Sequence, residues 1–358
     1  MKLLVEAPLN SLSLGNVSIN FLKELHSKNV EVGLFPVGGV DIQAHDLSKD
    51  FVEFLQVSTD QRFDFLKKDI PSLRLWHLNG SENRKNAQQH LYTFYECNEP
   101  TKTEVAIAKA QDNVFFSSTY SKNKFVENGC ENASYVPLGF DNSFFNTGKK
   151  YLKDVIHFGL MGKFEKRKNT GQIIAAWASK YGNNNKYQLT CCVTNPFFKP
   201  EDMQNIIQSV LGGKRYTNIN FLPYLQKNIE VNELLNAIDI DLTGLSFSEG
   251  WNLPSFNATC LGKWSIVHNA TAHTDWADNQ NSILVESEGE TDCYDNVFFQ
   301  RGAEFNQGTW PIYSVESMIA AMEKSEQKAG KVNLEGQKLK NMITYSNTVD
   351  QILSKIFN

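Results

Sequence analysis

Two segments in the second half of the chain carry residues that could bind a charged ligand. In the first, HFGLMGKFEKRKNTGQIIAAW (157–177), Lys163, Lys166, Arg167 and Lys168 come directly before an expected helix. Cations beside a helix N-terminus suit a diphosphate, which gains their charge and the free N–H groups of the helix. Taken alone, such a basic turn is also typical of a solvated surface.

The second segment, residues 246–286, combines a carboxylate with a new helix start. Glu249 and Gly250 follow an expected strand, and a helix that begins near Pro254 carries Asn257 on its first turns. Further along, the sequence AHTDW contains His273 and Asp275, for which we expect a structural turn. Side-chain oxygens at 249 and 257 could accept hydrogen bonds from hydroxyl groups.

The elements that must position these residues alternate between β-rich runs and amphipathic stretches. This alternation predicts parallel sheets covered by helices. In the first helix, which follows Gly15 and Asn16, apolar residues recur at helical spacing, so strand one is expected to lead into a helix through a glycine turn. The expected strands are 3–7, 30–36, 73–78, 92–97, 113–118, 154–162, 187–195, 218–224, 238–244, 264–268 and 282–286, and residues from 315 onward are expected to be mainly helical.

A chain of 358 residues is longer than a single hydrophobic core usually supports, so we expect two domains. The polar segment 142–153 contains Asn and Gly turn formers and interrupts the strand pattern, which is typical of a linker. Two doubly wound domains would place the carboxyl ends of their sheets around a shared cleft, where ligands bind in open α/β sheets. The sequence therefore predicts an α/β protein of two Rossmann-like domains facing a central cleft.

Bulk composition excludes several other classes. The formal net charge of −5 gives no global basic surface for nucleic acid or anionic lipid. No apolar run is long enough to span a bilayer, and MKLLVEAPLN does not have the layout of a secretory signal, so a cytoplasmic location is expected. The six cysteines form no CxxC pair or His/Cys cluster, and we identify no DxD-type acidic site committed to a metal, so no metal is expected.

Together the two segments resemble the retaining, nucleotide-sugar-dependent glycosyltransferases of family 4 (glycosyl transferases group 1). That family's pattern runs "GR/GK…RKG", then "EGxGLPxxEAxAxG", then in one branch "SAHTEYxxxxNAxLV". In the first half, YTFYECNEP, AQDNVFFSSTYSKNKFVENG and YVPLGFD are similar to the family's corresponding segments. Four motifs in the family's order are hard to obtain by chance. The resemblance implies the GT-B architecture, with domains at 1–141 and 154–335, a linker at 142–153, and a helix at 336–358 that packs back on the N-terminal domain.

The resemblance also implies roles for individual residues. Lys163 and Lys168 match the basic pair on the donor diphosphate, assisted by Arg167, and Glu249 matches the carboxylate that binds the donor sugar. Asn257 departs from the pattern, because the family has a second Glu there that binds the ribose. The implied site comprises the catalytic residues Glu249, Lys163, Lys168 and His77, the donor-binding residues Gly15, Gly162, Arg167, Gly250, Trp251, Asn252, Leu253 and Asn257, and Glu96 on the acceptor side.

Several of these residues also fit structural roles. His77 fits a strand-end histidine and Glu96 a surface carboxylate. Trp76 and Trp177 fit core or cleft-wall residues, whereas Trp251 is the exception, because it lies inside the donor motif. The function that the resemblance implies is metal-independent transfer of a sugar, with retention, from a UDP- or GDP-sugar to a hydroxyl. The acceptor could be a glycan, a lipid-linked sugar, a protein or a modified nucleobase. The alternative is a catalytically weakened sugar-nucleotide-binding or scaffolding protein on the same fold. A nicotinamide oxidoreductase is disfavoured, because no GxGxxG follows the first strand.

Overall fold

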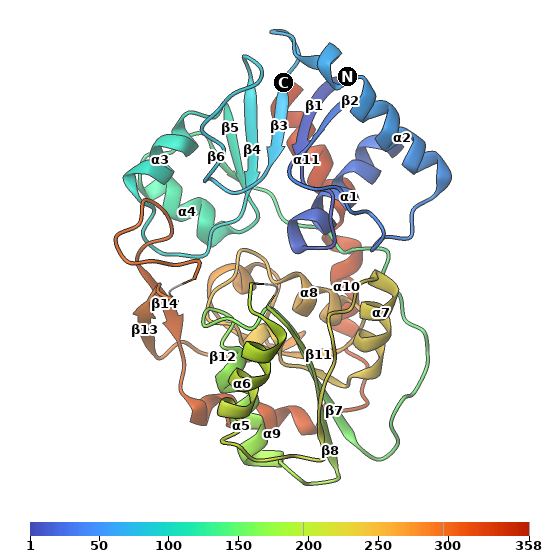
Figure 1. The fold of residues 1–358 in the computed structure, drawn as a ribbon, viewed down its shortest axis with the longest axis vertical. Helices are drawn as coiled ribbons and strands as arrows, with labels where there is room; N and C mark the ends of the chain where they lie inside the picture. The colour runs from blue at the N-terminus through green and yellow to red at the C-terminus, as the bar shows by residue number, and fades with distance from the viewer. Residues whose placement is uncertain (196, 296, 358) are drawn as a thin grey trace. The chain divides into compact units, whose positions relative to one another are not determined.

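The computed structural model describes residues 1–195, 197–295 and 297–357 (Figure 1). The chain divides into two compact units, and each contains its own sheet. The first unit comprises Met1–Asp141, Arg301–Gly308 and Ile343–Asn358, and the second comprises Asn142–Gln300 and Thr309–Met342. Among the described helices, none combines the length and apolar character that crossing a membrane requires.

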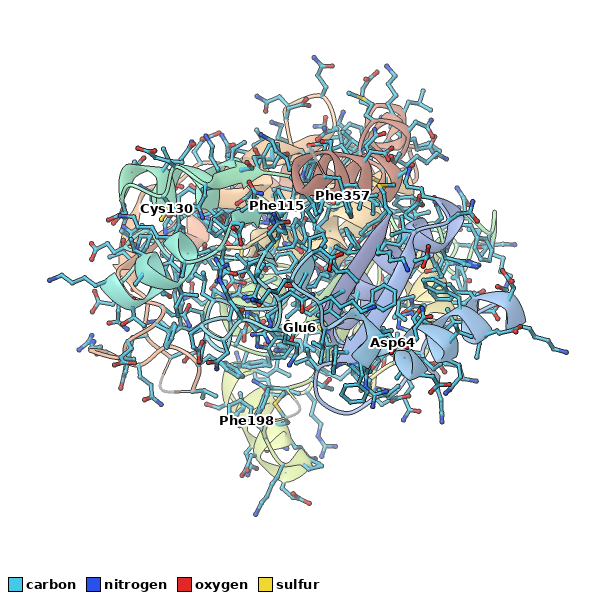
Figure 2. All side chains as sticks on the ribbon, turned by 90° about the horizontal axis from the view of Figure 1, so that it is seen from above. Glu6, Asp64, Phe115, Cys130, Phe198 and Phe357 are labelled. Carbon is cyan, nitrogen blue, oxygen red and sulfur yellow. The ribbon has the colours of Figure 1, made fainter. Side chains whose placement is uncertain are left out.

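The first unit is built on a six-stranded parallel sheet with the order β2-β1-β3-β4-β5-β6. Its inner strands β1, β3 and β4 are almost wholly buried, as strands covered on both faces must be. Figure 2 labels Phe115, a fully buried ring of β5, and Phe357, at the exposed end of the last helix. The elements of this unit are β1 (Lys2–Ala7), α1 (Ser13–Ser27), β2 (Glu31–Pro36), α2 (Lys49–Asp60), η1 (Arg62–Phe65), β3 (Ser72–Leu75), β4 (Gln89–Thr93), α3 (Lys102–Lys109), β5 (Asn113–Phe116), α4 (Thr119–Glu127), β6 (Ala133–Tyr135) and α11 (Tyr345–Phe357).

The second unit repeats this architecture with the strand order β12-β11-β10-β7-β8-β9, again parallel throughout. A two-stranded antiparallel hairpin of β13 and β14 adds to it. The elements are β7 (Ile156–Gly162), α5 (Thr170–Tyr181), β8 (Tyr187–Val193), α6 (Pro200–Val210), β9 (Ile219–Phe221), α7 (Asn228–Ala237), β10 (Ile240–Asp241), η2 (Thr243–Leu245), α8 (Leu253–Cys260), β11 (Trp264–His268), η3 (Thr271–Asp275), β12 (Ser282–Val285), β13 (Gly289–Asp292), β14 (Thr309–Ile312), α9 (Val315–Glu326) and α10 (Leu334–Met342).

The strand orders fix where a ligand can bind. In the second unit the chain builds outward from β7 through β8 to β9, then returns to place β10 on the other side of β7. The connections after β7 and β10 therefore start side by side at the carboxyl edge of the sheet, at the reversal of strand order where open α/β sheets bind ligands. In the first unit the same reversal lies between β1 and β3. The expected parallel sheets and this doubly wound order are thus confirmed for both units.

Several expected boundaries were wrong. The segment 142–153, expected as a linker, belongs to the second unit, where Phe145 N and Thr147 N donate to the side-chain oxygens of Asn232 and Asn236. The segment 301–308, expected in the C-terminal domain, belongs to the first unit. The helix expected at 336–358 is two helices, of which α10 belongs to the second unit and α11 to the first. Long-range contacts decide these boundaries, and local composition does not report them.

Gly15 was expected in the turn before the first helix, but it lies inside α1, which begins at Ser13. A Cβ atom at position 15 would lie 2.1 Å from the backbone oxygen of Asn10. The glycine is therefore required because the loop after β1 folds closely over the first turn of the helix. A sequence pattern cannot distinguish this close approach from a turn, since both favour glycine.

The end of the chain is fastened to the first unit through Gly139. Phe140 N donates to Ile343 O (3.0 Å), and a Cβ atom at Gly139 would lie 1.9 Å from the backbone nitrogen of Tyr345. In α11, Val349 and Ile352 are fully buried, and α11 packs against α1 and β5. Docking of this helix therefore depends on backbone-to-backbone contact at a residue without a side chain.

We expect Gly139→Ala to lower the free energy of unfolding by about 1–3 kcal/mol, because the added methyl group would force the 343–345 backbone away. Urea denaturation would measure this. Gly39→Ala is the matched control, since a Cβ atom there meets nothing within 4 Å. Equal stability of Gly139→Ala and the control would contradict this account of how the helix docks.

Candidate functional site

The loop after β7 presents its cations at the reversal point of the second sheet. Gly162 ends the strand with φ +119°, a backbone conformation that glycine adopts most readily. The loop closes where Thr170 Oγ1 donates to Lys163 O (3.1 Å), and α5 begins directly afterwards. Asn169, at the N-cap of α5, has φ +56°, and its side chain donates to Tyr313 Oη (2.9 Å) instead of capping the helix. The first N–H groups of α5 therefore receive no hydrogen bond from the side chain of the N-cap residue.

The loop after β10 reaches the same place from the other side of β7. Asp241 is fully buried and accepts hydrogen bonds from Thr243 N (3.1 Å) and Ser255 Oγ (2.7 Å). Thr243 Oγ1 in turn accepts from Met161 N on β7 (3.1 Å). These bonds hold η2, the loop 246–252 and the first turn of α8 against the end of β7.

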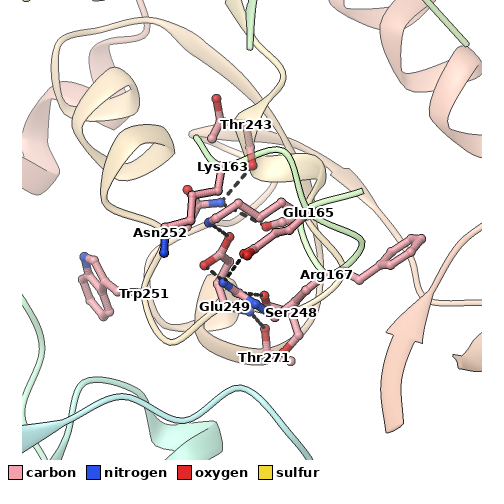
Figure 3. Close-up of polar contacts among 12 residues, drawn as sticks. Lys163, Glu165, Arg167, Thr243, Ser248, Glu249, Trp251, Asn252 and Thr271 are labelled. Carbon is pink, nitrogen blue, oxygen red and sulfur yellow. Dashed lines mark hydrogen bonds and ion pairs between the residues drawn. The ribbon is translucent and has the colours of Figure 1, made fainter. Parts of the chain in front are cut away.

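A compact cluster of charges joins the two loops (Figure 3). Glu249 accepts from Lys168 Nζ at 2.6 Å through Oε1 and from Arg167 Nη1 at 3.0 Å through Oε2. Arg167 also pairs with Glu165 (2.8 Å) and donates to Ser248 O (2.6 Å). The side chains of Glu249, Arg167 and Glu165 are at most 9% exposed, and that of Lys168 is 16% exposed. The cluster thus brings Glu249 to Lys168 and Arg167, which precede it by 81 and 82 residues in the sequence.

Burial alone would raise the pKa of Glu249, but the nearby charges of Lys168 and Arg167 outweigh it and lower the pKa to about 2. Glu249 is therefore ionised at neutral pH. The cluster is balanced, because two cations face Glu165 and Glu249. An anionic ligand must share Lys168 with Glu249, whereas a polyol would find an ionised acceptor in Glu249 itself.

Lys163 occupies a different setting from Lys168. Its ammonium lies 5.2 Å from the ring centre of Phe298 and 5.7 Å from that of Phe197. The two rings meet edge to face at 4.9 Å. Lys163 and Phe298 are half-buried, and cation–π attraction there contributes about 0.5–2 kcal/mol. A phosphate, which offers a full charge, could draw the ammonium away.

The segment 250–257 turns from the charged loop into α8. Asn252 caps the helix with φ +70°, and its Oδ1 accepts from Ser255 N. Asn257 lies one turn further on and is 5% exposed. Trp251 is 2% exposed and packs edge to face on Phe256, with ring centres 5.2 Å apart. Its indole is therefore part of the core and offers no open face for stacking.

Gly15, His77 and Glu96 belong to the first unit. His77 is exposed just beyond β3, its ring 5.4 Å from that of Trp76, and its backbone oxygen accepts from Ser81 Oγ (2.6 Å). Glu96 is half-buried in the segment after β4. The strand expected at 92–97 ends at Thr93, because the following aromatic residues are packed without continuing the hydrogen-bonded ladder.

Sequence reasoning missed three contributors to the site. Glu165 lies inside the basic turn KFEKRK, where its negative charge could have indicated an ion-pair partner for Arg167. Ser248 acts through its backbone oxygen, and Thr271 accepts from Glu249 N (3.1 Å), which no sequence signal indicates. Across residues 1–195, 197–295 and 297–357, no group of three or more His, Cys, Asp or Glu side chains is arranged to hold a metal ion.

No known family model matches the chain, and no curated protein matches it in sequence. Solved structures do match over its whole length. Sucrose-phosphate synthase from Thermosynechococcus elongatus superposes with a TM-score of 0.68 at 12% identity, covering 99% of this chain and 98% of that one. HepE from Anabaena, in complex with UDP and glucose, gives 0.62 at 13% identity with the same coverage. The UDP-forming α,α-trehalose-phosphate synthase from Burkholderia vietnamiensis gives 0.65 at 9% identity, covering 99% and 98%.

The chain has the GT-B fold. It has two parallel six-stranded sheets, and the strand order of each sheet reverses once. The superposition on the sucrose-phosphate synthase covers nearly the full length of both chains. The charged cluster lies at the reversal point of the second sheet of this GT-B chain.

The lowered pKa of Glu249 makes stability depend on pH in a defined direction. Its folded-state pKa of about 2 is below its ordinary value of 4.5, so its stabilisation is complete above the ordinary value and is lost as pH falls toward 2. We expect the difference in unfolding free energy between wild type and Glu249→Gln to shrink by up to about 3 kcal/mol over that interval. Urea denaturation at a series of pH values from 6 to 3 would measure it.

The control for this experiment is Glu335→Gln. Glu335 pairs with Lys338 on the surface, where such pairs contribute little. Its stability should follow that of wild type at each pH. A constant difference between wild type and Glu249→Gln across the series would show that the cluster does not hold Glu249 ionised.

Proposed function

We propose that this chain is a glycosyltransferase that moves a sugar from a nucleoside diphosphate donor to an acceptor hydroxyl, with retention of configuration and without a metal ion. The observation that carries the proposal is the buried contact of Lys168 and Arg167 with Glu249 at the reversal point of the second sheet. The site offers cations for a diphosphate and, within one hydrogen bond of them, an ionised acceptor for sugar hydroxyls.

The diphosphate would lie between the basic loop and the start of α5. Lys168 is the more exposed of the two cations in the cluster, and Lys163 would add a second ammonium by leaving its aromatic neighbours. The uncapped N–H groups at the start of α5, after Asn169, favour negative charge as well. In the transition state these groups would stabilise the charge of the departing nucleoside diphosphate, which needs no metal ion.

Glu249 would hold the donor sugar. It is anchored on its inner side by Arg167, so the carboxylate keeps its position when Lys168 turns to the phosphate. The backbone of Gly250 to Leu253 would contribute N–H groups next to the sugar. Transfer passes through an oxocarbenium-like state, and fixed hydrogen bonds to the sugar favour that state over the ground state.

Asn257 would face the ribose. Its amide oxygen can accept from a diol but carries no charge, so ribose binding should be weaker than with a carboxylate. This residue is also what favours the second candidate, a protein on the same fold that binds a sugar nucleotide without turning it over. Both candidates predict binding, and turnover separates them.

For the donor we propose a UDP-sugar first and a GDP-sugar second. HepE was solved with UDP and glucose, and the trehalose-phosphate synthase is UDP-forming. We propose that the acceptor binds to the first unit, where Glu96, His77 and Gly15 lie at or near the carboxyl ends of the strands.

A nucleotide-sugar panel tests the function. Ligands that bind only the folded state raise its melting temperature, so UDP-, GDP-, ADP- and TDP-sugars should be compared by thermal shift. With the donor so found, Glu249→Gln should lower the rate of sugar transfer or donor hydrolysis far more than it lowers affinity for the bare nucleoside diphosphate. Wild-type turnover in this variant would contradict the role of Glu249, and binding without any turnover in wild type would favour the second candidate.

Lys168→Ala and Lys163→Ala should each weaken binding of the same nucleoside diphosphate by about 1–3 kcal/mol, the cost of losing a hydrogen bond to a charged group. Calorimetric titration would measure it. Lys180→Ala is the matched control, because Lys180 lies on the same unit and pairs with Glu323 on the surface. Unchanged affinity in the Lys168 variant would overturn the phosphate assignment.

A further inference from the structure

The loop that carries Glu249 is supported from behind by η3. Thr271 Oγ1 accepts from Glu249 N (3.1 Å), and Ala272 N donates to Glu249 O (3.4 Å). Thr271 has φ +52°, which is costly for a β-branched residue and persists only where surrounding contacts impose it. The backbone of Glu249 is thus held on both its N–H and its C=O by a strained turn.

His273, in the same turn, is fully buried and uses both ring nitrogens. Nδ1 lies 2.9 Å from His268 O, and Nε2 lies 3.0 Å from Asn252 Nδ2. A carbonyl oxygen can only accept, so Nδ1 must carry the proton. Nε2 of the neutral ring is then an acceptor, which matches the amide N–H that Asn252 presents.

The orientation of the Asn252 amide is set independently of His273. Nδ2 also lies 2.9 Å from Thr243 O and 3.2 Å from Ser246 Oγ, while Oδ1 accepts from Ser255 N at the start of α8. Turning the amide over would set Oδ1 against the Thr243 carbonyl and Nδ2 against the Ser255 N–H. The two hydrogens of Nδ2 point to its two nearest partners, Thr243 O and His273 Nε2, and Ser246 Oγ is the most distant of the three. The contacts of Nδ1 and those of Asn252 therefore agree that His273 Nε2 is an acceptor.

We propose that His273 is a positioning residue for the donor site: as the neutral Nδ1–H tautomer it holds Asn252, and through Asn252 the loop 246–252 that carries Glu249. The inference rests on the proposed function for its catalytic consequence, but the tautomer and the loop order do not depend on it. His273 is fully buried, and Asn252 lies between its ring and the start of α8. His273 therefore acts on the donor site through Asn252 and not by contact with the ligand.

The charges around His273 agree with a neutral ring. Burial lowers its pKa to about 4, Glu249 acts to raise it, and His268 and Lys168 act to lower it. His268, itself buried, has a pKa lowered to about 4 by burial as well. A second proton on His273 would point at the Asn252 N–H and break the bond.

Two substitutions separate the two nitrogens of the ring. In His273→Gln the side-chain oxygen can reach the place of Nε2 and accept from Asn252, whereas in His273→Asn the amide nitrogen can take the place of Nδ1 and donate to His268 O. Because Asn252 also caps α8, the helix that carries Asn257, we expect His273→Asn to raise the dissociation constant of UDP about tenfold. Through Glu249 it should also lower kcat more than it raises KM, while His273→Gln stays within about threefold of wild type in both measurements.

His157→Asn is the matched control. His157 is a buried histidine on β7 whose ring nitrogens also both have partners, Ala237 O at 2.9 Å and Thr190 Oγ1 at 2.7 Å. Its loss should reduce stability without a selective effect on UDP affinity. If His157→Asn and His273→Asn weaken UDP binding equally, or if the Gln and Asn variants at 273 behave alike, the positioning role is overturned.

Two readouts are independent of the proposed function. Imidazole ¹⁵N NMR of the histidine-labelled protein should show Nδ1 protonated and Nε2 unprotonated for His273 at neutral pH. Amide hydrogen exchange of residues 249–255 should be faster in His273→Asn than in His273→Gln. A protonated Nε2 would overturn the inference even if UDP binds, whereas the expected tautomer and exchange without any nucleotide binding would reject only the proposed function.

Discussion

The structure of the second unit depends on one constraint: buried charges must be compensated. Arg167 and Glu249 are almost wholly excluded from water, which would cost several kcal/mol for each charge without a partner. The chain meets this cost by bringing the loop after β7 to the loop after β10, so that Arg167 bridges Glu165, Ser248 and Glu249. Lys168 completes the balance at the more exposed side, where a ligand can compete for it.

The sheet topology makes that meeting possible. Because β10 pairs directly with β7 and runs parallel to it, residues that follow these two strands leave the same edge of the sheet side by side. Around the charged cluster, hydrogen-bonded polar groups hold the second loop: Asp241, Thr243, Asn252 and His273 are joined by hydrogen bonds and have hardly any exposure to solvent. Such networks are rigid when every member is satisfied, which is what a site with a fixed carboxylate requires.

Much of the fold could be predicted from the sequence. Alternation of short apolar runs with amphipathic stretches is a local signal, and it located most strands of both sheets, such as 187–195 for β8 and 264–268 for β11. It failed where local signals are weak or shared. The short strand β6 and the hairpin of β13 and β14 were not expected, and the run 238–244 is only partly strand, because Thr243 begins a turn of 3-10 helix. The run 92–97 stays largely buried past the end of its ladder, so apolar character overstated the strand.

The sequence by itself determined the residue types of the site and their order along the chain: a basic turn before a helix, then a glutamate and a helix start 81 residues later. Only the tertiary structure decided their contacts, since the ion pairs of Glu249, the support of its backbone by Thr271 and the tautomer of His273 depend on distances between distant segments. It also decided the boundaries at 301, 309 and 343, because assignment to a unit follows from long-range packing that local composition does not record. Lastly, the tertiary structure placed Trp251 in the core and the Lys163 ammonium near two aromatic rings. The sequence was compatible with other positions for both side chains.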